Sequence, residues 1–371
     1  MKQIRPALLL VLIFSLLQST PARATKYAGE FLKIPVGARA IGMGGGFTAV
    51  DDDATAPYWN PAGMVYLPYR EVTAQHDWRF GDLLVHDYFG GVMPLGGETG
   101  KKAALGVTFI RLSTDDIPVT PRPGDLKPGE FLDYGIDGQP GTFDYGEGDG
   151  KWEVGERLLI PPDRIFMASS YDAAGMISYA RQHGPHLAYG LNLKFVHSSI
   201  PDTIPGEHVT SWGAGLDGGI LYMPTDAITL SASAHDLTTT YIAWSNGTHE
   251  QISPTLDTGF GVNFFPAPRH AITWGFDLAW GFERRSLDSE FSLGGQTWDI
   301  RTGLEYWYAN MVALRAGAFG KDLNFGAGVR YKQFGADYAV SITRFFASDN
   351  PNFPSDTSFD PSQLISIGWS W

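Results

Sequence analysis

The sequence contains no cysteine in 371 residues, which excludes disulfides, thiol nucleophiles and thiolate metal sites. Charged residues make up only 18% of the chain, less than the roughly one quarter usual in soluble domains. Positive charge is the scarcer sign, since 27 Lys and Arg stand against 40 Asp and Glu. The formal net charge of −13 argues against nucleic acid as a partner.

Motifs of enzyme active sites are also missing. No serine lies in a Gly-x-Ser-x-Gly elbow, and the run Gly42–Gly46 lacks the Gly-Lys-Ser/Thr of a phosphate-binding loop. His183 and His186 lie in a predicted turn without a third ligand nearby, which favours exposed histidines over a metal pair. We therefore expect no enzymatic activity and no required cofactor.

Long apolar runs are absent except near the start of the chain. Residues 7–17 are apolar, follow Lys2 and Arg5, and precede the small-x-small site Ala22-Arg23-Ala24. Eleven residues are too few for a membrane helix, which needs about 20, so residues 1–24 are predicted to be a signal peptide. Its removal would change the net charge from −13 to −16.

From residue 70 onward, apolar side chains alternate with small or polar ones. In residues 187–195, for example, Leu191 and Leu193 share one face, and Asn192 and Lys194 share the other. Fourteen such segments are predicted as strands, at 70–80, 84–94, 102–113, 164–181, 187–199, 208–224, 227–237, 254–266, 269–282, 298–308, 310–319, 323–333, 335–346 and 362–371.

The predicted fold class is all-β: a transmembrane antiparallel β-barrel of about 14 strands over residues 69–371. Many predicted strands have ten or more residues, the length of a tilted spanning strand, whereas strands in soluble domains usually have about five or six. The apolar faces would meet outer-membrane lipid and the glycine-rich polar faces would line the lumen. In the alternative, a soluble secreted sandwich, the same apolar faces would form the core.

The predicted connections alternate in length. Those after even-numbered strands are short, and most of those after odd-numbered strands are long, at 114–163, 200–207, 238–253, 283–297 and 347–361. This asymmetry is typical of outer-membrane barrels and places both ends of the mature chain in the periplasm. In the lumen, we expect the carboxylates of Asp277 and Glu305 to pair with cations such as Arg301, Arg315 and Arg330 rather than to serve as acid and base.

Residues 25–68 precede the first strand and are rich in glycine and apolar residues. This composition favours neither a helix nor a loose tail, so the segment is predicted to be a hatch or plug inside the barrel. Its glycines would allow close backbone packing, and Asn60-Pro61-Ala62-Gly63 favours a turn. The predicted hatch residues are Gly42, Gly44, Gly45, Gly46, Asn60, Pro61, Ala62 and Gly63.

The same segment resembles the N-terminal signature of the PorV/PorQ family of outer-membrane barrels, relatives of the FadL-type barrels. The resemblance is carried by the runs at 29–32, 37–40, 42–45 and 58–63, and continues at 304–307, 313–317 and 328–332. It implies a component of type IX protein secretion that binds secreted cargo and passes it to a surface attachment complex. Around residues 60–63 it implies a structural or gating role.

The predicted extracellular loop at 114–163 is strongly acidic, with twelve acids against four basic residues and nine glycines. Asp133, Asp137, Gly138 and Asp144 fall at positions 1, 5, 6 and 12 of an EF-hand-like pattern, although Gly135 replaces one ligand. The sequence thus predicts possible calcium ligands, the alternative being a solvated acidic loop. These ligands are Asp133, Asp137, Asp144, Glu147, Asp149 and Glu156.

The last predicted strand has Trp369 and Trp371 on one face, and Trp371 is the final residue. An aromatic end on an amphipathic strand resembles the signal recognised by the barrel-insertion machinery. Three functions stay open: type IX secretion, FadL-like transport of hydrophobic small molecules through the lumen, and a soluble secreted binding protein.

Overall fold

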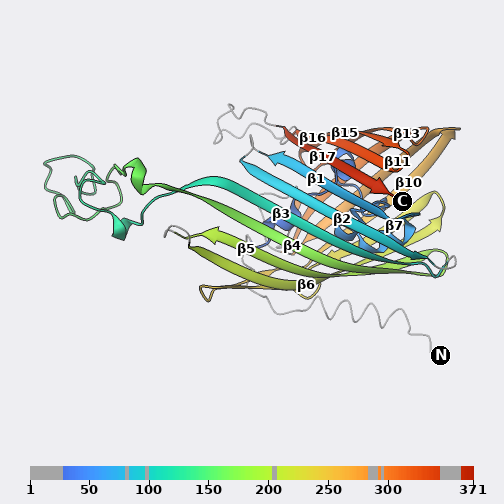
Figure 1. Ribbon diagram of the computed structural model, residues 1–371, viewed down its shortest axis with the longest axis horizontal. Helices are drawn as coiled ribbons and strands as arrows, with labels where there is room; N and C mark the ends of the chain where they lie inside the picture. The colour runs from blue at the N-terminus through green and yellow to red at the C-terminus, as the bar shows by residue number, and fades with distance from the viewer. Residues whose placement is uncertain are drawn as a thin grey trace.

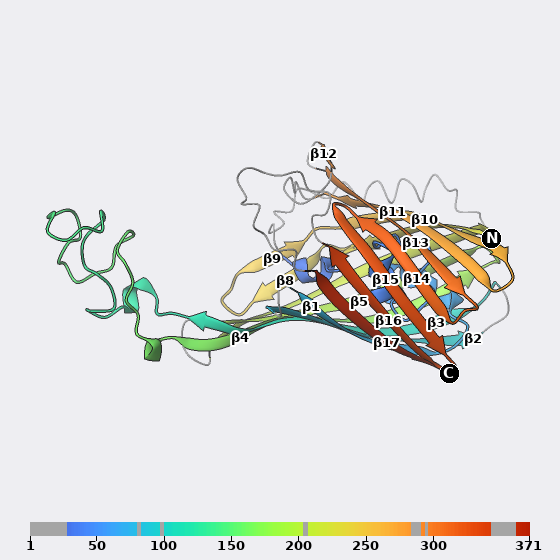
Figure 2. The same cartoon turned by 90° about the horizontal axis from the view of Figure 1, so that it is seen from above.

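The computed structural model describes residues 28–79, 83–96, 100–202, 207–282, 291–293, 296–342 and 361–371. Within these ranges the chain forms a closed antiparallel β-barrel of 14 wall strands (Figures 1 and 2), as predicted. The predicted signal peptide, the first three residues of the predicted hatch, and most of the predicted loops 283–297 and 347–361 lie outside the described residues.

Each wall strand pairs antiparallel with its two neighbours, and pairing of β1 with β17 closes the barrel. The strands are β1 (Glu71–Arg79), β2 (Leu84–Gly96), β3 (Ala103–Val119), β4 (Phe166–His183), β5 (Leu187–Pro201), β6 (His208–Thr225), β7 (Ile228–His235), β10 (Thr255–Ala267), β11 (His270–Gly281), β13 (Gln296–Tyr308), β14 (Val312–Phe319), β15 (Asp322–Tyr331), β16 (Phe334–Ile342) and β17 (Ser362–Ser370).

The period-two pattern sorts side chains between the two faces of the wall. On β5, Leu191 is 55% exposed and points outward, whereas Asn192 and Lys194 are buried and point inward. The outward residues of the other wall strands are mostly Leu, Val, Ile and aromatic residues. The arrangement follows from the pleat, since successive side chains of a strand point to opposite faces.

The alternation of connection lengths is also present. The turns after β4, β6, β10, β13 and β15 have two or three residues each, and all lie at one end of the barrel. The ends of the wall meet there, because backbone N–H and C=O groups of Arg70 and Trp371 are hydrogen-bonded to each other at 3.0 and 3.2 Å. The first wall strand therefore begins, and the last wall strand ends, on the same side of the barrel.

At the opposite end, three short strands modify the predicted loops. β8 (Thr240–Trp244) and β9 (His249–Ile252) form a hairpin that pairs with β6, and β12 (Phe291–Leu293) pairs with β13. Strand β3 continues to Val119, so the first residues of the predicted loop 114–163 are strand rather than loop. The rest of this loop protrudes beyond the barrel (Figure 1), with short 3-10 turns η3 (Pro123–Asp125) and η4 (Pro162–Arg164).

Residues 28–68, called here the plug segment, lie inside the barrel (Figure 2) and contact strands all around the wall. The expectation that this glycine-rich segment would contain no helix was wrong, because it forms four short helices of one or two turns each. The segment contains η1 (Glu30–Lys33), α2 (Ala38–Gly42), α3 (Ala56–Trp59) and η2 (Pro61–Tyr66). None of the described helices is long and apolar enough to span a membrane.

Glycines of the wall face the plug segment and let its backbone approach closely. A Cβ at Gly275 or Gly303 would collide with the backbone of Gly46 or Met43, respectively. These contacts explain why the inward faces carry so much glycine. The wall glycines at which a Cβ would meet the plug segment within about 3 Å are Gly90, Gly106, Gly190, Gly219, Gly259, Gly261, Gly275, Gly303, Gly317 and Gly326.

Candidate functional site: two hollows on either side of the plug segment

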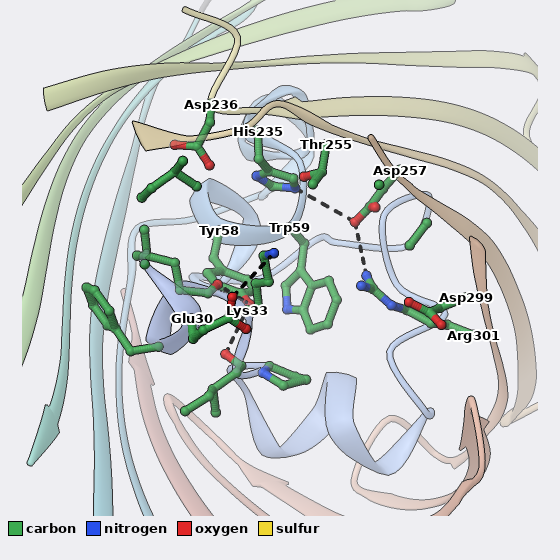
Figure 3. A pocket seen from close by; sticks show the side chains of 18 of the residues that line it. Glu30, Lys33, Tyr58, Trp59, His235, Asp236, Thr255, Asp257, Asp299 and Arg301 are labelled. Carbon is green, nitrogen blue, oxygen red and sulfur yellow. Dashed lines mark hydrogen bonds and ion pairs between the residues drawn. The ribbon is translucent and has the colours of Figure 1, made fainter. Parts of the chain in front are cut away.

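A cavity of about 640 Å³, the outer hollow, lies at the long-loop end of the barrel. Its wall comes from the loop-side ends of β1, β7, β10, β11, β13 and β14, and its floor is the plug segment. Apolar side chains of Phe31, Leu32, Trp59, Ile252 and Phe319 line much of it. In Figure 3 the Trp59 indole lies between Tyr58 and the Asp257–Arg301 pair. The volume falls within the range of small-molecule sites, about 300–1,000 Å³.

Charged side chains on the rim of the outer hollow are paired with one another. Arg301 Nη1 lies 3.0 Å from Asp257 Oδ2, and His235 Nε2 lies 3.8 Å from the same oxygen (Figure 3). Lys194 Nζ lies 2.9 Å from Asp217 Oδ1 and 2.7 Å from Asp236 Oδ1. Because these buried charges neutralise each other, the hollow combines apolar surface with fixed polar groups.

A second cavity of about 430 Å³, the inner hollow, lies at the short-turn end of the barrel. It is lined by the starts of β1, β11 and β16 and by the ends of β13, β15 and β17. The plug segment contributes Gly37, Ala38, Arg39, Asp52, Asp53 and Thr55. Its lining is strongly polar, and its charged side chains are those of Arg39, Asp52, Asp53, Glu71, Glu305, Arg330, Lys332 and Asp337.

Arg39 connects the plug segment to the wall through an ionic network. Its guanidinium donates two hydrogen bonds to the Glu305 carboxylate, at 2.8 and 2.9 Å, and lies 2.5 Å from Asp52 and 3.2 Å from Asp53. Burial alone would lower the pKa of Arg39, but Asp52 and Glu305 raise it well above its ordinary value. Arg39 therefore stays charged, and its release would remove one of the two arginine partners of the buried Glu305 carboxylate.

The network continues along the wall strands, partly as predicted. Arg315 donates to Glu305 at 2.6 Å and to Asp337 at 2.7 Å, and Arg330 Nη2 lies 2.8 Å from Asp337. The expected pairing of Glu305 with an arginine is thus present. Asp277 behaves differently, because it accepts hydrogen bonds from plug groups rather than from an arginine.

Asp277 and Asn60 fix two further points of the plug segment. Asp277 accepts hydrogen bonds from the backbone N–H groups of Phe47 and Thr48, at 2.8 and 2.9 Å, and from the Thr48 hydroxyl at 2.9 Å. Asn60 donates from Nδ2 to the carbonyl of Ile220 on β6, at 3.2 Å, and to that of Thr48, at 3.1 Å. The plug segment is therefore attached to several strands at once.

Most of the predicted hatch residues lie at contacts between the plug segment and the wall, whereas Gly63 faces Asp51 within the plug segment. Gly42, Gly44 and Gly46 face wall backbone at Gly326, Ala318 and Gly275, respectively. Gly45 packs near Arg301, Trp59 and Phe319 instead. The turn at Asn60, Pro61 and Ala62 packs on Gly190 and Gly219.

The predicted calcium ligands are distributed along the protruding loop. Asp133 accepts hydrogen bonds from the N–H groups of Gly148 and Gly150, at 2.8 and 2.9 Å, and Asp144 accepts one from Asp137 at 2.9 Å. Further backbone N–H groups donate to the carboxylates of Asp137, Glu147, Asp149 and Glu156. No group of three or more acidic or histidine side chains in the described ranges is arranged to hold a metal. Calcium binding here stays a prediction.

Trp369 and Trp371 lie on the outer surface at the short-turn end, where their rings stack 4.5 Å apart. They are 42% and 45% exposed. This position fits the aromatic girdle at a membrane interface, and a role of the two rings in barrel insertion stays a prediction.

Sequence reasoning missed several residues of the two hollows. Asp217 and Asp236 were not identified as partners of Lys194, nor Asp257 as the partner of Arg301. The available signal was an inward-facing charge on a strand, which requires a partner of opposite sign. The sequence does not say which strand supplies that partner.

A closed antiparallel barrel with an apolar exterior, an internal plug segment and two lumenal hollows has the architecture of an outer-membrane β-barrel. Among solved structures, the chain is similar to the toluene transporter TodX of Pseudomonas putida, with 12% identity and a TM-score of 0.54 over 91% of this chain and 98% of that chain. It is also similar to CymD, a monoaromatic hydrocarbon channel, with 13% identity and a TM-score of 0.55 over the same shares of the two chains.

A FadL homologue of Pseudomonas aeruginosa is similar at 12% identity, with a TM-score of 0.49 over 91% of this chain and 98% of that chain. No protein-family model matches the chain, and no curated protein sequence matches it. The FadL-like outer-membrane barrel fold expected from the sequence is confirmed.

Proposed function

We propose that this protein is a non-enzymatic outer-membrane channel that passes small, largely apolar molecules through its lumen. The observation that carries the proposal is the outer hollow of about 640 Å³, which has aromatic side chains on its walls and the plug segment as its floor. A second hollow on the other side of the plug segment continues the same path toward the short-turn end. The fold shared with two hydrocarbon channels supports this proposal.

Transport can be tested with purified protein reconstituted into liposomes. We expect uptake of radiolabelled toluene to exceed that of protein-free liposomes, and uptake of a hydrophilic sugar of similar mass to stay at background. Equal uptake of the two probes would indicate an open aqueous pore and contradict the proposal. Uptake of neither probe would contradict it as well.

The location follows from the same proposal. An outer-membrane barrel reaches the membrane after removal of the predicted signal peptide at residues 1–24, and its short turns face the periplasm. The meeting of Arg70 and Trp371 at the short-turn end supports a periplasmic position for both wall ends. Cysteines introduced singly at Phe143 and at Ala309 test this orientation. An impermeant maleimide added to intact cells should label only the Phe143 site.

A second candidate function is cargo binding in type IX secretion. It rests on the sequence resemblance to the PorV/PorQ family, and the protruding loop supports it. Phe143, Tyr145 and Val154 are 92%, 77% and 82% exposed on that loop, among many carboxylates. Exposed apolar residues of this kind suit a protein partner. Deletion of residues 120–163 should abolish cargo release to the cell surface, and unchanged release would exclude this candidate.

A further inference from the structure

The two hollows approach each other closely at one point of the plug segment. Pro35 lines the outer hollow and Gly37 lines the inner hollow, so only Val36 separates them along the chain. Two residues of extended chain span at most about 7 Å. The barrier between the hollows is therefore about one side chain thick at this position.

Four buried side chains form this barrier, called here the septum: Val36, Met43, Phe47 and Trp59. The first three are 0% exposed and Trp59 is 2% exposed. The Trp59 indole N–H donates a hydrogen bond of 3.0 Å to the Val36 carbonyl, and its ring meets that of Phe47 edge to face, with centroids 5.8 Å apart. Trp59 also lines the outer hollow, so its indole forms part of the floor of that hollow (Figure 3).

The wall adds little to the septum on the β13 side. The inward residues of β13 run from Arg301 in the outer hollow to Glu305 in the inner hollow, with Gly303 between them. Gly303 has no side chain, and the space in front of it is filled by the backbone of Met43. On this side, the plug segment rather than a wall side chain therefore separates the hollows, and Trp59 is the largest side chain of the septum.

We propose that Trp59 is the gate between the two hollows, and that a permeant passes when its indole swings aside while the plug segment stays in place. This inference rests on the proposed function and specifies its mechanism. Displacing the indole breaks one hydrogen bond and its ring contacts. Displacing the whole plug segment would break the Arg39 network, the three hydrogen bonds to Asp277 and the close packing on the wall glycines.

The gate also indicates a class of permeant. Trp59 meets Tyr58 as well as Phe47 edge to face, with centroids 5.2 and 5.8 Å apart. A displaced indole would leave a slot bordered by two aromatic rings. Such a slot favours a small, planar, apolar molecule, because aromatic pairs prefer edge-to-face and offset geometries.

The first test compares Trp59→Ala with a matched tryptophan variant outside the lumen. Trp212→Ala is the control, because Trp212 lies on the outer surface and is 65% exposed. In planar bilayers, we expect at least a tenfold higher potassium chloride conductance for Trp59→Ala than for wild type, and an unchanged conductance for Trp212→Ala. Equal conductance of the two variants would contradict the gate. Heat-modifiable gel mobility checks that each barrel is folded.

The second test locks the plug segment to the wall. The hydroxyls of Thr48 and Ser231 are hydrogen-bonded at 2.8 Å, so the side chains at these two positions meet across the contact between the plug segment and β7. The chain has no other cysteine, so Thr48→Cys combined with Ser231→Cys forms a single defined cross-link. The reduced form of this variant is its own control.

We expect the oxidised and reduced forms to take up toluene at the same rate, because the proposed gate needs no movement of the plug segment. Uptake that is lost on oxidation and restored by reduction would overturn the inference and leave the proposed channel function intact. The converse result is that wild type takes up no toluene while Trp59→Ala still conducts ions. That result would contradict the proposed channel function but support the inference that Trp59 closes the septum. If Trp59→Ala does not fold, Trp59→Leu and the cross-link decide the question.

Discussion

Substituting one wall glycine gives a direct measure of how tightly the plug segment is seated. Gly317 on β14 faces the backbone of the plug segment at Met43 and Gly44. A Cβ at Gly317 would lie 2.6 Å from the Met43 carbonyl oxygen, and closer still to the Met43 carbonyl carbon and the Gly44 nitrogen. These are backbone atoms, so no side-chain rotation can relieve the collision.

The expected magnitude follows from that geometry. Ordinary contacts between heavy atoms are about 3.5–4.0 Å, so Gly317→Ala requires the plug backbone or strand β14 to move by about 1 Å. Overpacking of this kind typically costs about 1–3 kcal/mol. We expect Gly317→Ala to lower the free energy of unfolding by about 2 kcal/mol, near the middle of that range.

Gly368→Ala on β17 is the matched control. Gly368 also faces the lumen, but a Cβ there would have only the Val72 carbonyl oxygen within 4 Å, at 3.6 Å. Its effect should stay within about 0.5 kcal/mol. Urea unfolding in detergent, followed by tryptophan fluorescence and by the gel mobility of the folded barrel, measures both variants. Equal stabilities would refute the view that wall glycines form the seat of the plug segment.

Three further predictions concern charged groups. Glu305→Gln should lower the free energy of unfolding by about 3 kcal/mol in the same assay, because it leaves the buried Arg39 guanidinium without its wall partner; an unchanged value would mean that the ion pair contributes little. Burial, reinforced by Asp53, raises the pKa of Asp51 well above its usual value. The free energy of unfolding of wild type should therefore fall as pH rises above about 4, and Asp51→Asn should lack this part of the fall. Parallel pH profiles of the two proteins would refute this prediction. Calcium should raise the thermal unfolding midpoint of wild type but not of Asp133→Ala, and a shift that persists in the variant would exclude this loop as the site.

The sign of the Asp51 prediction follows from linkage. A carboxyl with a raised pKa in the folded state binds its proton more tightly there than in the unfolded chain. Below the unfolded pKa both states are protonated and the group has no effect. As pH rises toward the folded pKa, the unfolded chain ionises first and becomes relatively more stable. Neither carboxylate oxygen of Asp51 has a hydrogen-bond partner in the described residues, which is consistent with a neutral group.

The two candidate functions place their working parts at different positions. Transport depends on the lumen, where Trp59 separates two hollows, whereas cargo binding depends on the protruding loop. Removal of residues 120–163 and substitution of Trp59 should therefore have separate effects. If the variant that lacks residues 120–163 also lost toluene uptake, this would indicate that the loop contributes to the entrance of the outer hollow.

The sequence by itself determined the wall of this barrel. Alternation such as that of Leu191, Asn192, Leu193 and Lys194 assigns every residue of a strand to one face, because the pleat repeats every two residues. Short turns such as the one after His183 are set by local residues as well. The strand number, the two faces and the alternation of short and long connections all follow from such local signals.

Only the tertiary structure decided how the plug segment is held and where the hollows lie. Arg39 binds Glu305, 266 residues away, because the closed barrel brings β13 next to α2. In the acidic loop, likewise, only the structure shows that backbone N–H groups donate to the predicted calcium ligands, and calcium binding there stays a prediction. Pairing between distant residues depends on closure and register of the whole sheet, and a local pattern carries no information about either.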